Sequence, residues 1–136
     1  GGYNNVGVIH QPDNVETTKR SVLFQEDPGS QNQYAPTDPG ATTARTWRYD
    51  LKDGTLEVVA RVDQSADPAA RLGVWESSGI VDASRLYGPG AFLLTVQAHS
   101  VFVETAPGLD LNGDGQPDWL NKREGGQLAL LRIPGA

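Results

Sequence analysis

Short runs of β-branched and aromatic residues, separated by clusters of glycine, proline, asparagine and aspartate, extend through most of this chain. Runs of this length are typical of strands, whereas the residues between them favour tight turns and interrupt helices. We therefore expect an all-β protein with little helix. The expected strands are residues 6–9, 22–25, 45–50, 55–62, 92–97, 101–105 and 128–133.

The clearest turn joins two of these strands. Residues 45–50 and 55–62 are separated by Leu51-Lys52-Asp53-Gly54, and an Asp-Gly pair supplies the positive-φ positions that a tight hairpin needs. The sequence therefore predicts an antiparallel hairpin at this point.

Three further segments are expected outside the strands. Residues 27–44 are rich in proline, glycine, serine, glutamine and threonine, and they predict a long exposed loop. Residues 65–71 predict a second loop. Residues 82–87 are expected to form one helical turn, capped by Asp82 or Ser84, that ends at the Gly88-Pro89-Gly90 sequence.

Length and charge narrow the class of protein. The 136 residues suit one domain or part of one. Lys and Arg number 11 against 17 Asp and Glu, so the net charge of -6 repels the phosphate backbone of nucleic acid. The absence of cysteine excludes disulfides, thiolate zinc sites and cysteine nucleophiles. No apolar stretch approaches the roughly 18 residues of a transmembrane helix, so we expect neither a nucleic-acid partner nor a transmembrane segment.

The strongest chemical pattern is a loop in which oxygen-bearing side chains alternate with other residues. Its positions 1, 3, 5 and 9 are Asp110, Asn112, Asp114 and Asp118. Calcium takes six to eight oxygen ligands at about 2.3–2.6 Å, a need that alternate side chains can meet. Gly115 permits a sharp turn, and the carbonyl of Gln116 can add a ligand. The sequence predicts a calcium site; the alternative is a polar turn that binds nothing.

The surroundings of this loop do not fit an ordinary EF-hand. Asn121 stands where an EF-hand has its bidentate glutamate, and no amphipathic helix flanks the loop. The segment instead resembles the calcium loops of thrombospondin type 3, dockerin or FG-GAP repeats.

A second group of polar residues surrounds the strand expected at residues 22–25. Asp13 and Asn14 precede it and Glu26 and Asp27 follow its last residue, an arrangement that could place four oxygen groups near one sheet edge. Acidic turn residues that only cap strands are the commoner case. The two histidines, His10 and His99, lack the close spacing of a zinc site, so we expect each to be packed or exposed.

Known nucleophile and nucleotide motifs do not occur. Ser77-Ser78-Gly79 lacks the glycines of a nucleophile elbow, and the chain has no phosphate-binding glycine-rich loop. The sequence therefore indicates neither a serine hydrolase nor a nucleotide-binding protein.

Several short motifs occur in order along the chain: Gln11-Pro12-Asp13-Asn14, Glu26-Asp27, Trp75-Glu76-Ser77-Ser78-Gly79-Ile80-Val81-Asp82, Val96-Gln97-Ala98-His99 and Glu124-Gly125-Gly126-Gln127-Leu128. Together they resemble the C-terminal part of the PhoX-type bacterial alkaline phosphatase-like proteins. The resemblance spans nearly the whole chain. It implies a calcium-dependent β-propeller that is exported to the periplasm, the cell surface or the extracellular space.

The resemblance also implies metal ligands. In that family, acidic residues at strand ends hold calcium and, in true phosphatases, a calcium and iron cluster that hydrolyses phosphate esters. Glu26 and Glu76 are the residues that match best, and we expect them to face a shared metal or cleft, separate from the calcium loop. The iron site of the phosphatases also uses a cysteine, which this chain lacks. Hydrolase activity is therefore left open.

Length leaves two architectures open. Propeller blades take roughly 40 to 50 residues and a ring needs at least four, so this chain would supply about three blades. The remaining propeller portion or another protein chain would then complete it. The alternative is a seven-stranded β-sandwich. The corresponding functions are part of a metal-dependent phosphatase, a noncatalytic calcium-stabilised surface or scaffold module, or a carbohydrate or adhesin module.

Overall fold

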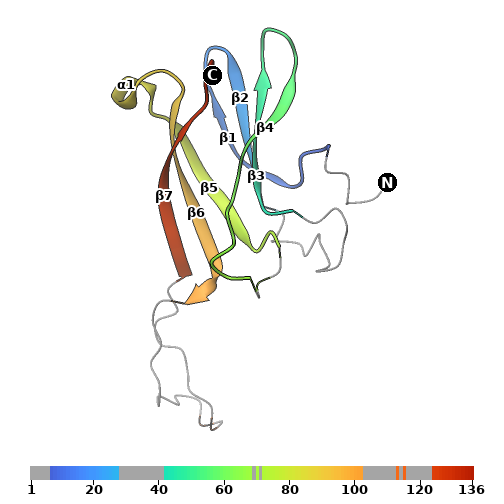
Figure 1. Cartoon of the computed structure of the whole chain (residues 1–136), viewed down its shortest axis with the longest axis vertical. Coiled ribbons are helices and arrows are strands. Elements are labelled where there is room, and N and C mark those ends of the chain that lie inside the picture. Colours follow the sequence, from blue (N-terminus) through green and yellow to red (C-terminus); the bar gives the residue numbers. More distant parts are fainter. Residues whose placement is uncertain are drawn as a thin grey trace.

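The computed structural model describes residues 7–27, 42–68, 70, 72–102, 113, 115 and 124–136. These residues form seven antiparallel strands in two sheets, together with one short helix (Figure 1). The first sheet contains β1 (Pro12–Thr17), β2 (Ser21–Glu26), β3 (Arg45–Asp50) and β4 (Leu56–Arg61). The second contains β5 (Trp75–Asp82), β6 (Ala91–Phe102) and β7 (Glu124–Arg132). The helix α1 (Ser84–Tyr87) lies between β5 and β6 in the chain.

Each sheet is a simple meander. The strand orders are β1-β2-β3-β4 and β5-β6-β7, and every neighbouring pair is antiparallel. The all-β prediction is therefore confirmed. The described residues form no closed sheet and no propeller sheet, and they make two meanders where about three blades were expected.

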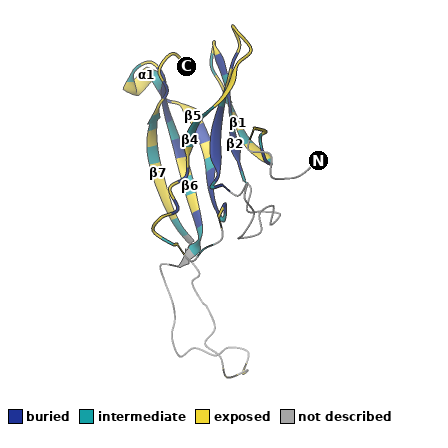
Figure 2. Cartoon of the chain, turned by 45° about the vertical axis from the view of Figure 1, so that its right-hand side comes forward, coloured by how far each residue is buried: buried dark blue, intermediate teal, exposed yellow. Residues whose placement is uncertain are grey.

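The two sheets share a hydrophobic core. Leu23 of the first sheet packs with apolar residues of the second and with the segment after β7: Ile80, Phe92, Leu94 and Ile133. Alternate residues of β2 face this core, because successive side chains of a strand point to opposite faces. In Figure 2 the buried residues lie along the strands of both sheets, whereas exposed residues occupy the turns and much of the edge strands β1, β4 and β7.

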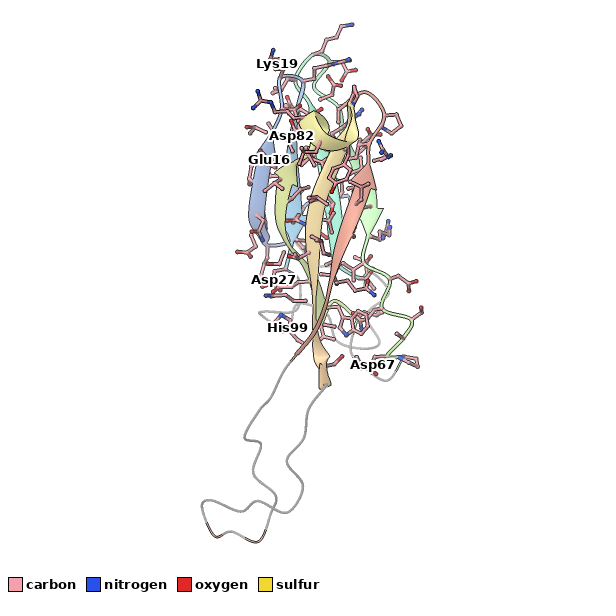
Figure 3. The ribbon with its side chains drawn as sticks, turned by 90° about the vertical axis from the view of Figure 1, so that its left-hand side faces the viewer. Glu16, Lys19, Asp27, Asp67, Asp82 and His99 are labelled. Carbon is pink, nitrogen blue, oxygen red and sulfur yellow. The ribbon has the colours of Figure 1, made fainter. Side chains whose placement is uncertain are left out.

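The sheets meet along one pair of edge strands. Residues of β1 contact residues of β5, and the backbone N–H of Asp82 donates a hydrogen bond of 3.0 Å to Oε2 of Glu16. Both residues are labelled in Figure 3, toward the end of the sheets that carries α1. This seam fixes the position of β5 beside the first sheet.

The predicted hairpin is confirmed. Strands β3 and β4 are joined by residues 51–55, where the N–H of Gly54 donates to the carbonyl of Asp50 at 3.0 Å. Gly54 has a φ of 74°, the conformation for which the Asp-Gly pair was expected. The predicted helical turn is also present. Its N-cap residue is Ala83, which makes no side-chain capping bond, so the prediction that Asp82 or Ser84 caps it was wrong. Asp82 Oδ1 accepts a hydrogen bond of 2.8 Å from the N–H of Ser84, and the helix ends before Gly88 as expected.

Other strand predictions were wrong. Residues 7–9 are not in a strand, and the first strand is β1, whose opening Pro-Asp-Asn sequence is typical of a turn. Strand β5 was not predicted, because Ser77-Ser78-Gly79 interrupts the run of β-branched and aromatic residues that is typical of a strand. The strand passes this point by a bulge, at which Gly79 has a φ of 57°. Strand β6 continues without a break through residues 98–100, and residues 103–105 lie outside the described part.

The predicted loops are free of helix and strand wherever the structure describes them, but the first is not exposed there: Thr42 and Ala44 are buried, and Asp27 and Thr43 are half-buried. Residues 27 and 42–44, and residues 65–68 and 70, are not in helices or strands. Within the described part of the chain, no helix has the length and apolar character that crossing a membrane requires.

Candidate functional site

Glu76 is the centre of a polar cluster at one end of the two sheets. It is the second residue of β5 and is only 8% exposed. Its Oε1 lies 3.0 Å from Nε2 of His99, and its carboxyl group is hydrogen-bonded to the carboxyl group of Asp27. The cluster therefore joins β5, the end of β6 and the residue that follows β2.

The strand pairing explains why these residues meet. Glu76 pairs with Gln97 on β6, and His99 follows within the stretch where the pairing between β6 and β7 is irregular. Asp27 directly follows β2, and its N–H donates to the carbonyl of Gln11 at 3.0 Å. Asp27 and His99 lie toward the same end of the sheets in Figure 3, away from Glu16 and Asp82.

The environment changes the proton affinity of Glu76. Burial raises the pKa of this carboxyl group above its ordinary value, and the adjacent Asp27 carboxyl raises it further, whereas the hydrogen bond with His99 opposes the shift. The side chain of His99 is 35% exposed. The pair therefore places a carboxyl group of raised pKa behind a solvent-accessible imidazole.

Glu26 lies in a different environment from Glu76. Its Oε1 accepts hydrogen bonds from Nη2 of Arg45 at 2.7 Å, Nε1 of Trp47 at 2.9 Å and the backbone N–H of His10 at 2.8 Å. Its Oε2 accepts from the backbone N–H and from Nε of Arg45, at 3.1 and 2.8 Å. A carboxylate has about four lone-pair sites, so these donors occupy them all.

In the structure, Glu26 and Glu76 therefore face different groups and do not form the predicted shared site. Glu26 faces Arg45 and Trp47, whose guanidinium and ring also stack at 4.6 Å. Asp27, the neighbour of Glu26, is the residue that contacts Glu76. Metal ligation by Glu26 or Glu76 stays a prediction, and for Glu26 it would require release of these hydrogen bonds.

Asp13 and Asn14 lie near Glu26 along the β1–β2 pairing. Asn14 is opposite Gln25 and is half-buried, whereas Asp13 is exposed, and Nδ2 of Asn14 donates to Oδ2 of Asp13 at 3.0 Å. The two residues therefore form the polar end of a strand, as expected of residues that only cap it.

A second polar network supports the beginning of β5. Nε1 of Trp75 donates to Oγ of Ser100 at 2.7 Å, and Ser100 Oγ donates to Oδ2 of Asp67 at the same distance. The N–H of Trp75 also donates to Oε1 of Gln64 at 3.3 Å. No sequence pattern indicates this network, because Gln64, Asp67, Trp75 and Ser100 are distant in the chain and share no motif.

The predicted calcium loop lies mostly outside the described residues. Asp110, Asn112, Asp114, Gln116 and Asp118 are all in that undescribed part, whereas Gly113 and Gly115 are described. Both glycines have positive φ angles, 75° and 78°. The loop follows β6 and precedes β7, so its ends are attached to the strand that carries His99 and to the neighbour of that strand.

Among the described residues, no group of three or more histidine, aspartate or glutamate side chains is arranged to hold a metal ion. Comparison with known proteins found no matching protein family, no similar curated protein and no similar solved structure. The resemblance to the PhoX-type proteins therefore stays a prediction.

Proposed function

We propose that this chain is a calcium-binding β-module of an exported protein, stabilised by calcium in the loop between β6 and β7. The observation that carries the proposal is the alternation of Asp110, Asn112 and Asp114 with two glycines. The positive φ angles of Gly113 and Gly115 support it, because a tight cation-binding loop needs such turns.

The donor set fits calcium better than iron. Asp110, Asn112, Asp114, Asp118 and the carbonyl of Gln116 would offer the hard oxygen ligands that calcium prefers. The iron that the family resemblance implies does not fit this chain. The chain has no cysteine, and both oxygens of Glu26 already accept hydrogen bonds.

The architecture supports a self-contained module. Two sheets with a common core are the arrangement of a β-sandwich, whereas three blades would give three separate meanders. We therefore favour the noncatalytic surface or scaffold module over a propeller fragment as the setting of the calcium loop. Export is part of the same proposal, since weak calcium sites are common in extracellular modules.

The melting temperature tests the calcium proposal. Calcium should raise the melting temperature of the unaltered chain, and Asp114→Ala should abolish this shift. Asp13→Ala is the matched control, because it removes an exposed carboxylate far from the loop in sequence and should preserve the shift. A calcium shift that survives Asp114→Ala would contradict the assignment of the site.

A second candidate function is hydrolysis of a phosphate ester, and the Glu76–His99 pair favours it. His99 could accept the proton of a water molecule at Nδ1 while Glu76, in contact with Nε2, orients the ring. The water oxygen would attack phosphorus, the ester oxygen would leave, and the imidazole would return the proton to it. Hydrolysis of p-nitrophenyl phosphate that is lost in Glu76→Gln is the expected result. Absence of hydrolysis would leave the noncatalytic module.

A further inference from the structure

The free edge of β7 lacks the features that usually protect an edge strand. Strand β7 pairs with β6 on one side, and among the described residues no strand pairs with its other side. It is nine residues long, contains no proline, and has no charged residue between Glu124 and Arg132. Edge strands normally carry charges, prolines or bulges that prevent pairing with another chain. The neighbouring edge strand β4 does carry charges, at Glu57 and Arg61.

Exposed apolar side chains lie on β7, the strand that has this free edge. Leu128 and Leu130 are 71% and 44% exposed. A crevice of about 240 Å³ lies between the two sheets beside β7, and residues of both β4 and β7 line it. Apolar side chains of the second sheet, including Leu94 and Leu131, form part of its wall. A strand added to the edge of β7 would cover part of this surface, since neighbouring strands lie about 4.8 Å apart.

We propose that β7 pairs antiparallel with β7 of a second copy of this chain. Pairing over the full length of the strand places Leu128 opposite itself, at the twofold axis. The same register places Glu124 of each copy opposite Arg132 of the other. Opposite charges in facing positions stabilise a strand pair, and like charges destabilise it.

The symmetry of this pairing agrees with the pleat of the sheet. A twofold axis perpendicular to the sheet keeps each face of the strand on the same side in both copies. Residues at equal distances from Leu128 then share a face, as antiparallel partners must. The result is one continuous sheet that joins the two three-stranded sheets, with an isologous interface closed at two copies.

An introduced cysteine tests the register directly, because the chain has none of its own. Antiparallel partners have Cα atoms about 4.5–5.5 Å apart, within the range that a disulfide spans. Leu128→Cys should therefore form a disulfide-linked dimer rapidly on mild oxidation. Leu86→Cys is the matched control, because Leu86 is 80% exposed and lies on α1, outside the strand that is proposed to pair. Equal rates of dimer formation in the two variants would overturn the proposal.

A charge reversal tests the same pairing without a cross-link. Sedimentation of the unaltered chain should show a concentration-dependent dimer. Arg132→Glu should weaken dimerisation about tenfold, and the double variant Glu124→Arg with Arg132→Glu should restore it. Arg85→Glu, on α1, should have no effect. A chain that is monomeric at every concentration, or an Arg132→Glu effect that the second reversal does not rescue, would show that β7 is not a self-pairing edge.

Discussion

The carboxylate of Glu26 and the guanidinium of Arg45 form an ion pair in which both side chains are completely buried, with Oε1 and Nη2 2.7 Å apart. The pair joins β2 to β3, and Trp47 and the backbone of His10 also donate to Glu26. Nη2 of Arg45 in turn donates to the carbonyl of Val8 at 2.9 Å. A buried charge is tolerated only when it is paired and hydrogen-bonded, so this network fixes the N-terminal segment against the first sheet.

Replacement of Glu26 by glutamine should be strongly destabilising. Glu26→Gln leaves the guanidinium of Arg45 buried without a counter-charge, and loss of one partner of a buried pair costs about 3–5 kcal/mol. Urea denaturation measures the change in the free energy of unfolding. Glu57→Gln is the control, because the Glu57 side chain is 51% exposed, so solvent screens its pair with Arg48 and the pair contributes about 1 kcal/mol or less. Similar small losses in both variants would contradict the structural role of Glu26.

Gly90 should be intolerant of any side chain. Its φ is 74°, and a Cβ atom at this position would lie 2.2 Å from the carbonyl oxygen of Ile133. Gly90→Ala should therefore lower the melting temperature well beyond the effect of Gly135→Ala. Gly135 has a similar φ of 78° but open space around it, so its replacement costs only the backbone strain of about 1–2 kcal/mol. Equal effects of the two substitutions would argue against the close approach of Gly90 to Ile133.

Glu76 should make stability depend on pH. Burial, followed by the contact with Asp27, raises the pKa of Glu76 above its ordinary value of 4.5, although His99 opposes the shift. The folded chain then holds this proton more tightly than the unfolded chain, so the free energy of unfolding should decrease as the pH rises above 4.5 and through the folded-state pKa. Glu76→Gln, which carries no charge at any pH, should remove this contribution.

Denaturation of Glu76→Gln and of the unaltered chain at a series of pH values measures the contribution of Glu76 to stability. The difference between the free energies of unfolding of Glu76→Gln and the unaltered chain should grow as the pH rises through that window. A difference that is constant with pH would show that Glu76 is not protonated preferentially in the folded state. Glu57→Gln, which removes an exposed carboxylate, provides the reference for a pH profile without this burial.

The sequence was sufficient for features that depend on local chemistry. The β3–β4 hairpin follows from the Asp53-Gly54 turn, and the α1 turn follows from Asp82 and the glycines after it. Strand β1 could not be found in this way, because its first residues favour a turn and most of its side chains are exposed. Its pairing with β2 supplies the stabilisation that its own sequence does not indicate.

The contacts between polar residues likewise could not be predicted from local sequence. Glu26 was predicted to be a metal ligand from a resemblance, but no local pattern indicates that Arg45, after a long connection, would neutralise it. His99 was expected to be packed or exposed, whereas it contacts Glu76 across two neighbouring strands. Such pairs depend on the register of strands, which a bulge at Gly79 and an irregular stretch of β6 both alter.

Isothermal titration of the chain with calcium tests the central proposal most directly. We predict saturable binding at one site, loss of that binding in Asp114→Ala, and retention of it in Glu76→Gln, since Glu76 belongs to a separate cluster. At a calcium concentration 100 times the dissociation constant, binding to the folded state alone adds about 2.7 kcal/mol of stability. Absence of calcium binding by the unaltered chain, or binding that Asp114→Ala leaves unchanged, would contradict the account.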